Sequence, residues 1–273
     1  MSGAVAAVGD NTIDCYAGRD SYSYVGGNAV NVAVQLTRLG RPAGYFGAVG
    51  PDAAWQQIRD TLARAGVDVA GVVVRPGRTS TSRIRVSQDG ARHFEAEDFG
   101  VCDGYRPDAA ALERIAGCAA AHIGLMPGAE PVRSYLADRG VLVSQDCGVT
   151  LPVGGYRWMG IAFCSEEAAG RPAERIAHDA VAGGAALAVV TRGADGSLAF
   201  DGRTWWRTRA KPAEVVDTTG AGDAFAAGFL DARLHGADVD QAMTAGARHA
   251  ALACGYIGAW PQAPGPAPPV TAG

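Results

Sequence analysis

Asp217-Thr-Thr-Gly-Ala-Gly-Asp223-Ala-Phe-Ala-Ala-Gly-Phe229 is the stretch of sequence that decides the fold. It follows a strand-like run, Glu214-Val-Val216, and its apolar second half is compatible with a helix. The glycines between them predict a tight turn whose free backbone N–H groups lie at a helix N-terminus, where anions bind well. Asp223 places a carboxylate beside that anion site, and phosphoryl transfer to a hydroxyl group needs both. A helix that is merely capped by Thr219 is the alternative.

Strand-like and helix-like segments alternate along most of the chain, with short connections that contain glycine. This alternation predicts an α/β fold in which helices cover both faces of a parallel sheet. The expected strands are 4–8, 43–49, 121–124, 141–145, 158–163, 187–191 and 197–200. The expected helices are 29–39, 53–65, 108–116, 131–139, 173–182, 223–235 and 240–254.

Two segments break this alternation, at about 11–25 and 79–98. The second has alternating polar and apolar residues on either side of Gln88-Asp-Gly90, which predicts a β-hairpin. We expect the two segments to form a small sheet that projects as a lid, with two surface hairpins as the alternative. Residues 1–260 are then a single domain, and the Pro/Gly-rich tail at 261–273 is expected to be disordered or loosely attached.

The composition is that of an ordinary globular protein, with 48% apolar and 19% charged residues among 273. A net charge of −4 argues against nucleic acid as the main partner. The chain has neither a membrane-span pattern nor a signal-peptide pattern, so a cytoplasmic enzyme without a membrane partner is expected. The five histidines lack metal-ligand spacing and are expected to be structural or on the surface, with His93 in the expected lid as the candidate exception.

Lys211 is the only lysine in the chain. It follows no glycine-rich loop, so the lysine of a P-loop is absent. The strand lysine of the protein kinases is absent as well. A phosphoryl group moved by this protein would therefore be held by helix N-termini, arginines and a metal ion.

Polar residues also stand at the ends of other predicted elements. Asp10 and Asp14 follow the first strand, where parallel sheets bind ligands, and turn chemistry around Asp10-Asn11 is the alternative. Gly26-Gly27 precedes a helix that carries Asn28 and Asn31, whose amides suit sugar hydroxyls, although an ordinary capped helix has the same sequence.

Two more groups follow later strands. A glycine-containing loop after a buried strand could bind nucleotide phosphates or a ribose, and such a loop is present at Thr191-Arg-Gly193-Ala-Asp-Gly196. A simple turn into the next strand is the alternative. Ser165-Glu-Glu167 suits a metal ion held through water, or the acidic first turn of a helix.

Gly26-Gly-Asn…Asn31 and Asp217–Asp223 together resemble the PfkB (ribokinase-type) carbohydrate kinases. Segments at 9–16, 193–197, 201–206 and 256–260 further resemble the bacterial fructoselysine 6-kinases within that family. The resemblance covers about residues 4–260. It implies a ribokinase-like three-layer α/β/α sandwich with a mostly parallel central sheet and a small β lid.

The resemblance also implies an activity, namely ATP-dependent phosphorylation of the 6-hydroxyl of a fructosamine, with fructoselysine first. The alternatives are another small sugar such as fructose or ribose, a nucleoside, or a sugar- and nucleotide-binding module without catalysis. Glu95, Glu97 and Asp98 cluster after the predicted hairpin, and we expect them to attract the amine derived from lysine.

Individual roles follow from the same resemblance. Asp223 matches the family's catalytic base. The anion hole for the transferring phosphoryl group matches Gly220, Ala221 and Gly222. The sugar-binding positions match Asp10, Asp14, Gly27 and Asn31. The nucleotide loop matches Thr191, Gly193 and Gly196.

Metal ions and assembly are implied in the same way. Glu167 matches the glutamate of the family's Asn-x-x-Glu magnesium motif, although Cys164 replaces the asparagine here. Asp217 lies near the position at which some members bind a monovalent cation such as K⁺. ATP, Mg²⁺ and a small sugar are the expected ligands, and a homodimer through the lid is an expected assembly.

Overall fold

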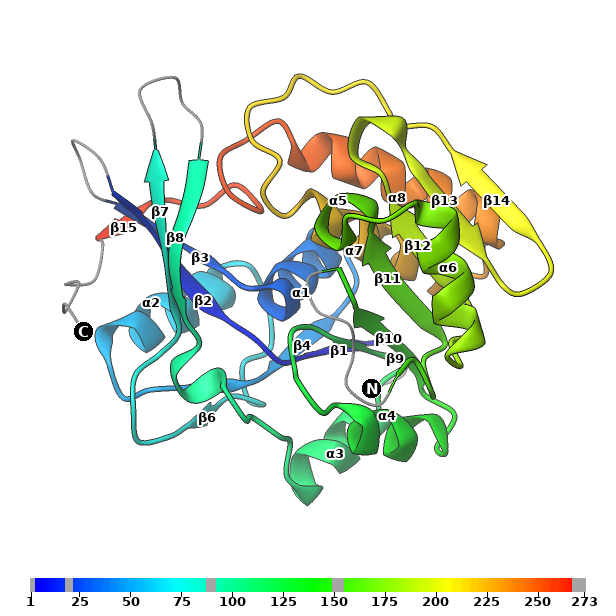
Figure 1. Cartoon of the computed structure of the whole chain (residues 1–273). Helices are drawn as coiled ribbons and strands as arrows, with labels where there is room; N and C mark the ends of the chain where they lie inside the picture. Colours follow the sequence, from blue (N-terminus) through cyan, green and yellow to red (C-terminus); the bar gives the residue numbers. More distant parts are fainter. Residues whose placement is uncertain (1–2, 18–21, 87–91, 149–154, 267–273) are drawn as a thin grey trace.

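The computed structural model describes residues 3–17, 22–86, 92–148 and 155–266, and its centre is an eight-stranded sheet (Figure 1). The strands of this sheet are β1 (Val5–Val8), β4 (Ala43–Phe46), β9 (Ala120–Ile123), β10 (Leu142–Asp146), β11 (Ile161–Ser165), β12 (Ala188–Thr191), β13 (Ser197–Phe200) and β14 (Trp205–Thr208). They lie in the order β14-β13-β12-β11-β10-β9-β1-β4. The strands from β12 to β4 are parallel, whereas β13 and β14 are each antiparallel to the strand before. This is the mostly parallel sheet that the sequence predicts.

Helices cover both faces of this sheet, because consecutive residues of a strand point to opposite sides. Val5 and Ala7 pack into the core of one face, and Ala6 and Val8 into that of the other. The first face carries α1 (Asn28–Arg38), α2 (Ala53–Arg64), α7 (Ala221–Leu234) and α8 (Val239–Ala253). The second carries α3 (Ala109–Ala116), α4 (Glu130–Ala137) and α6 (Ala173–Ala182). The predicted three-layer sandwich is confirmed; within the described residues, none of its helices has both the length and the apolarity to cross a membrane.

A second sheet stands beside the first (Figure 1). Its strands are β2 (Thr12–Ala17), β3 (Tyr22–Gly26), β7 (Thr81–Val86), β8 (Arg92–Asp98) and β15 (Gly265–Pro266), in the order β15-β3-β2-β7-β8. β7 and β8 form the predicted antiparallel hairpin, whose Asp-Gly turn lies outside the described residues. Tyr16, Tyr22, Tyr24 and Ile84 pack together as a small core of this sheet. The two segments that break the alternation therefore form one small sheet, as predicted.

The strand predicted at 43–49 is interrupted at Gly47. β4 ends at Phe46, and β5 (Ala48–Val49) pairs separately with β6 (Val73–Val74). A Cβ atom at Gly47 would lie 2.0 Å from the hydroxyl oxygen of Tyr45, so no side chain fits where the backbone changes direction. The other short elements are α5 (Glu166–Ala169) and 3-10 turns at Gly100–Cys102 and Gly193–Asp195.

The run Glu214-Val-Val216 is not a strand, and this prediction is wrong. Val215 and Val216 are 64% and 53% exposed, and the backbone N–H of Val216 donates to the carbonyl oxygen of Cys254 over 2.8 Å. The preceding strand is instead β14, which the sequence analysis does not predict. Valines favour a strand only where a neighbour supplies hydrogen bonds and a core, and β14 already occupies the edge beside β13.

The tail is attached as far as residue 266, which corrects the expectation of disorder for 261–266. The Gln262 amide donates to the carbonyl oxygen of Val25 and accepts from its N–H group, both over 2.9 Å. Gly265 and Pro266 then pair with β3. An edge strand offers unpaired backbone groups, and these hold a segment that has no apolar periodicity. The rest of the tail, 267–273, lies outside the described residues.

Candidate active site

The carboxyl ends of the parallel strands meet at one edge of the central sheet, where such sheets bind ligands. Asp10 follows β1, Asp146 ends β10 and Thr191 ends β12. Four strand spacings separate β1 from β12, so this row of strand ends spans about 19 Å. The predicted sugar positions near Asp10 and the predicted nucleotide loop after Thr191 therefore lie at opposite ends of one edge.

Asp10 is buried and fixes the start of α1. Its Oδ2 accepts from the backbone N–H of Asn28 over 2.6 Å, and its Oδ1 accepts from that of Leu125 over 2.9 Å. Burial raises the pKa of this carboxyl group, although the backbone hydrogen bonds oppose the rise. A Cβ atom at Gly124 would lie 2.2 Å from Oδ1, so the loop after β9 leaves just enough room for the carboxylate.

Gly27 caps α1 in a conformation that favours glycine, with φ of 103°. A Cβ atom there would lie 2.6 Å from the Cα atom of Asn11. The glycine thus lets the first turn of α1 approach the backbone that follows β1. As a result, the amides of Asn28 and Asn31 reach the same edge of the sheet as Asp10.

Asp223 lies in the first turn of α7 and accepts a hydrogen bond on each carboxylate oxygen. The Asn28 amide donates to Oδ1 and the Asn31 amide donates to Oδ2, both over 2.6 Å. The same Asn28 nitrogen also donates to Oδ2 of Asp146 over 2.7 Å. Asn31 is buried, whereas Asn28, Asp146 and Asp223 keep some solvent exposure, so a ligand can reach them. Two of the predicted residues, Asn31 and Asp223, are therefore in direct contact.

His122 of β9 orients the Asn28 amide from behind. Because the Asn28 nitrogen faces two carboxylates, its Oδ1 faces the ring and accepts from Nε2 of His122 over 3.1 Å. Nδ1 of His122 then accepts from the hydroxyl group of Ser144 over 3.0 Å. Burial lowers the pKa of His122 to about 3, so the ring is neutral. This histidine is structural, as the sequence predicts. Its partner Asn28 binds the carboxylates of Asp10, Asp146 and Asp223, which together form the acidic cluster.

The carboxyl groups of this cluster hold their protons more tightly than usual. The pKa of Asp223 is raised to about 8, first by burial and next by the charge of Asp146. The pKa of Asp146 is raised to about 6, again first by burial. A carboxylate of this kind readily accepts the proton of a hydroxyl group that is placed against it.

Gly220 and Gly222 shape the N-terminus of α7. Gly220 is the N-cap residue with φ of 72°, and a Cβ atom there would lie 2.3 Å from that of Ala259. A Cβ atom at Gly222, in contrast, would meet no atom within 4 Å. The helix start with Ala221 is therefore packed on one side and open on the other, beside Asp223, as an anion site requires.

Asp217 organises the loop before this helix. Its Oδ1 accepts from the backbone N–H and the hydroxyl group of Thr219 over 3.0 and 2.8 Å. Its Oδ2 accepts from the backbone N–H of Gly258 over 2.7 Å. Asp217 thus joins the glycine turn to the segment after α8.

Asp14 comes from the second sheet and is buried. The pairing registers align it with Tyr24 on one side and with Ser82 and then Glu97 on the other. Its pKa is raised to about 7 by burial first, then by the charges of Glu97, Asp10 and Asp217. The carboxyl group of Asp14 therefore begins a polar row that leads from the acidic cluster to the edge of the second sheet.

The loop after β12 is a tight turn at the far end of the edge. The Thr191 hydroxyl donates to the carbonyl oxygen of Cys164 over 3.3 Å, and the N–H of Arg192 donates to that of Gly196 over 2.8 Å. Gly196 has φ of 92°, and a Cβ atom there would lie 2.1 Å from the carbonyl oxygen of Thr208. Gly193 faces open space. Among the described residues, the 3-10 turn Gly193–Asp195 forms no hydrogen bond to Asp10, Asp146 or Asp223.

Glu167 is exposed on α5, after β11. Its neighbour Glu166 is engaged, because it pairs with Arg192 over 3.2 Å and accepts from the N–H of Ala173. Within the described residues, no three acidic, histidine or cysteine side chains gather as a metal site. Mg²⁺ in kinase sites is held by one or two carboxylates, water and substrate phosphates, so the free Glu167 carboxylate fits that role.

Asp146 is the functional candidate that the sequence analysis missed. It stands at the end of a predicted strand, as Asp10 does, so the same argument applied to 141–145 would have found it. Asn28 was recognised only as a sugar-binding amide, because its two carboxylate partners lie 118 and 195 residues away in the sequence.

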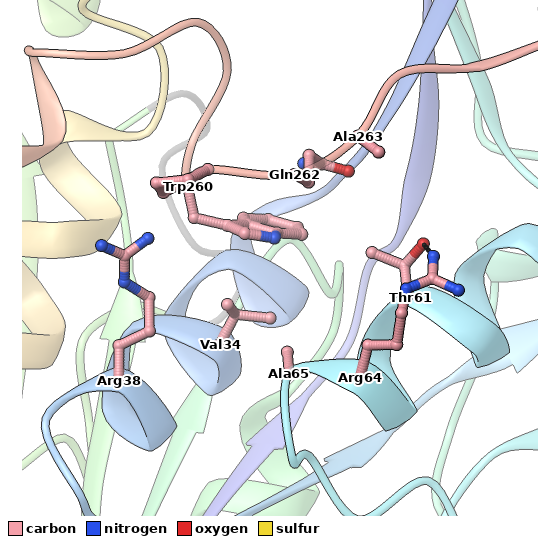
Figure 2. A pocket seen from close by; sticks show the side chains of 9 residues that line it. Val34, Arg38, Thr61, Arg64, Ala65, Trp260, Gln262 and Ala263 are labelled. Atoms are coloured by element: carbon pink, nitrogen blue, oxygen red, sulfur yellow. Dashed lines mark hydrogen bonds between the residues drawn. The ribbon is translucent and has the colours of Figure 1, made fainter.

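A cavity of about 420 Å³ lies at the other end of α1 and is separate from this cluster. Figure 2 shows Trp260 above Val34, with Arg38 on one side and Arg64 on the other. Arg64 donates to the hydroxyl group of Thr61 over 3.1 Å. The cavity contains no residue of the acidic cluster and takes no part in the chemistry described above.

Known proteins resemble this chain over nearly its whole length. The family model "pfkB family carbohydrate kinase" matches residues 8–114 and 162–264. The chain is 33% identical over 260 residues to a fructoselysine 6-kinase of Shigella flexneri, covering 94% of this chain and 99% of that one. It is 30% identical over 267 residues to a fructosamine kinase of Bacillus subtilis, covering 93% and 92%.

The fold is also that of a solved kinase. Arabidopsis thaliana ribokinase complexed with ribose and ATP superposes with a TM-score of 0.85 at 21% identity, over 94% of each chain. The chain therefore belongs to the pfkB family of carbohydrate kinases and is an ATP-dependent phosphotransferase that acts on an alcohol group of a sugar.

Proposed function

We propose that this kinase phosphorylates the 6-hydroxyl group of a fructosamine, and that fructoselysine is its substrate. Proteins named for these substrates align over nearly their full lengths with this chain. One structural observation supports a cationic fructosamine over a neutral sugar: the carboxyl groups of Asp14 and Glu97 share a row that begins beside Asp10. A fructosamine carries a positively charged amine, and such a row attracts it.

The transfer step uses the residues at the start of α7. The 6-hydroxyl oxygen forms a bond to the γ-phosphorus of ATP while the bond from that phosphorus to the bridging oxygen breaks, which releases ADP. Asp223 accepts the hydroxyl proton. The backbone N–H groups at Gly220, Ala221 and Gly222 would hold the transferring phosphoryl group, with that of Ala221 exchanging its present 3.1 Å bond to the carbonyl oxygen of Thr218 for one to the phosphoryl group. Asp10, Asp14, Gly27 and Asn31 hold the sugar.

The nucleotide would lie along the edge toward β12. Thr191, Gly193 and Gly196 form the turn that would hold it, and Mg²⁺ would neutralise its phosphates with Glu167 as a ligand through water. A monovalent cation near Asp217 is part of the same proposal, and turnover in K⁺ compared with Na⁺ tests it.

The second sheet would close over the sugar as a lid and exclude water from the transfer. β8 is its edge strand, and an unpaired edge is suited to pairing with a second copy of the chain. A homodimer through this sheet is therefore proposed, and its mass in solution, measured by light scattering, tests it.

A substrate panel tests the proposed function most directly. ADP release would be measured with fructoselysine, other fructosamines, fructose, ribose and adenosine. We expect kcat/KM for fructoselysine to exceed that for fructose at least tenfold. A higher kcat/KM with fructose, ribose or adenosine would assign the enzyme to that substrate instead.

Glu97 is the lid carboxylate that is best placed to meet the amine. Glu95 pairs with Arg85 over 2.7 Å, and Asp98 accepts from the N–H of Gly100 over 2.9 Å. Glu97 is exposed, and among the described residues it forms no such ion pair or hydrogen bond. It is therefore free to bind a cation.

The matched variants Glu97→Gln and Glu95→Gln test this assignment. We expect Glu97→Gln to raise KM for fructoselysine about tenfold while KM for fructose stays unchanged, since fructose has no amine. Glu95→Gln is the control and should change neither value. An unchanged KM for fructoselysine in Glu97→Gln would remove Glu97 from the substrate site without affecting the assignment of the sugar hydroxyl.

A further inference from the structure

Asp146 has no role in the proposed transfer step, yet each of its carboxylate oxygens accepts a hydrogen bond, as do those of Asp223, the proposed base. Oδ1 of Asp146 accepts from the backbone N–H of Gly148 over 2.7 Å, and its Oδ2 accepts from the Asn28 amide over 2.7 Å. The side chain is partly exposed at the carboxyl end of β10. It therefore points into the candidate site rather than into the core.

Asp146 and Asp223 are joined through a single amide nitrogen. Nδ2 of Asn28 lies 2.7 Å from an oxygen of Asp146 and 2.6 Å from an oxygen of Asp223. The two carboxylates are thus closer together than the sum of these distances. Within the described part of the chain, neither of them forms an ion pair with an arginine, histidine or lysine side chain, so no positive charge separates them.

The shared amide has one available orientation. Its two N–H groups are used by the two carboxylates, and its oxygen is used by Nε2 of His122. Rotation of the amide by about 180° would place its oxygen against a carboxylate oxygen and its N–H group against the Nε2–H of His122, and both contacts are repulsive. His122 and Ser144 thus hold Asn28 in place, and Asn28 holds the two carboxylates at a constant separation.

We propose that Asp146 is a positioning residue for the transfer reaction, which sets the proton affinity of Asp223 through its charge and through the Asn28 amide that the two share. Two carboxylates this close in a partly buried site do not both lose their protons easily. When Asp146 is ionised, Asp223 binds a proton more strongly. Asp223 is then a stronger base for the hydroxyl proton. The Asn28 amide holds the Asp223 carboxylate so that one of its lone pairs is directed at the substrate.

The surrounding charges are consistent with this coupling. The groups that face the pair are Asp10 after β1, the neutral His122 on β9, and the amides of Asn28 and Asn31 on α1. The charge of Asp146 is the largest influence on Asp223 after burial itself. Asp10 raises the pKa of both carboxyl groups, and its effect on Asp223 is weaker than that of Asp146.

The inference rests on Asp223 as the base of the proposed function, and the variant Asp146→Asn tests it. Asn at 146 keeps an oxygen for the Asn28 amide and removes the charge. The acid limb of kcat/KM against pH, measured between pH 5.5 and 9, should move down by at least one pH unit. KM for the sugar and for ATP should change less than threefold. A limb that stays in place overturns the proposal.

Two other results would also overturn it. A tenfold rise in KM for the sugar with an unmoved limb would make Asp146 a substrate ligand. A greater requirement for Mg²⁺ with an unmoved limb would make it a metal ligand. If Asp146→Asn does not fold, the pair Asp146→Gln and Asp146→Glu gives the same comparison, because the two side chains match in length and differ in charge.

A titration without substrates separates this proposal from the proposed function. The carboxyl carbon of Asp223, observed by NMR in protein labelled with ¹³C at aspartate, should titrate at lower pH in Asp146→Asn than in the parent protein. An unchanged midpoint overturns the coupling whatever the activity is. If instead the midpoint moves but Asp223→Asn retains turnover, the coupling stands and the base assignment fails.

Discussion

The side-chain amide of Asn31 donates a hydrogen bond of 2.6 Å to Oδ2 of Asp223, from a position 192 residues earlier in the chain. This bond joins the first turn of α1 to the first turn of α7, and the two helices pack against each other. The Gly-Gly-Asn segment and the Gly-Ala-Gly-Asp segment therefore act as one site.

Asp223→Asn should lower kcat by a factor of about 10² to 10⁴, the range expected for loss of a general base. The change also places an amide group where Asn28 and Asn31 both donate, so it removes an acceptor as well as a charge. ADP release measures the loss. Calorimetric binding of the sugar should stay within a few-fold of the parent value, and turnover within tenfold of the parent would exclude Asp223 as the base.

Stability should fall as the pH rises through the range in which the acidic cluster titrates. The pKa of Asp223 is raised from 3.8 to about 8, so the folded state binds this proton more tightly than the unfolded state does. The stabilisation is complete below about pH 4 and is lost as the pH rises toward 8. Asp223→Asn should therefore flatten the dependence of the unfolding free energy on pH, by up to about 1.4 kcal/mol per pH unit.

Urea unfolding of both proteins at pH 5, 6, 7 and 8 measures this difference. The other carboxyl groups with raised pKa values, Asp14 and Asp146, are present in both proteins and contribute to both curves. Parallel curves for the two proteins would show that Asp223 titrates with an ordinary pKa.

Gly220→Ala and Gly222→Ala should have opposite effects on stability. At Gly220 the new methyl group meets Ala259 and the φ of 72° is unfavourable, so we expect a loss of about 1–3 kcal/mol. At Gly222 the methyl group meets no atom within 4 Å, and alanine is the better helix former, so we expect a gain of about 0.5 kcal/mol.

Measurements of activity show whether Gly222 serves phosphoryl binding or only the stability of the helix. The methyl group of Gly222→Ala would stand in the space proposed for the phosphoryl group, so kcat/KM for ATP should fall at least tenfold in a protein that is no less stable. Thermal unfolding and ADP release on the same samples measure both effects. Full activity in Gly222→Ala would place the phosphoryl group elsewhere.

Asp231→Ala should destabilise the protein by about 2–4 kcal/mol, because it leaves the Arg41 guanidinium without its carboxylate partner. Arg41 is 8% exposed and its Nε lies 2.5 Å from Oδ1 of Asp231. The control is Asp60→Ala, which breaks the exposed pair with Arg59 and should cost less than about 1 kcal/mol. Denaturant unfolding compares them, and equal effects would mean that solvent reaches Arg41 freely.

Local patterns in the sequence determine the elements and part of the site. Strand–helix alternation is enough to predict the central sheet and its covering helices, because burial on both faces imposes long apolar runs on parallel strands. Gly27 and Gly220 mark sharp backbone turns at helix starts, and the polar residues beside them, Asn28, Asn31 and Asp223, meet in the structure. A glycine turn at a helix start and the polar residue beside it are adjacent in the sequence, so they can be predicted without knowledge of contacts between distant segments.

Contacts between distant segments decide the rest. Val215 and Val216 favour a strand by residue type, but β14 already occupies the sheet edge, so they stay exposed. Gln262 holds the polar tail in place because the backbone of Val25 offers it hydrogen-bonding groups. Asp146 and His122 acquire their roles from Asn28, which the fold brings between strands β9 and β10 and helix α7. The sequence by itself thus determined which residues can take part in chemistry. The tertiary structure decided which of them share hydrogen bonds and shift one another's pKa values, because these depend on burial and on spatial neighbours rather than on sequence spacing.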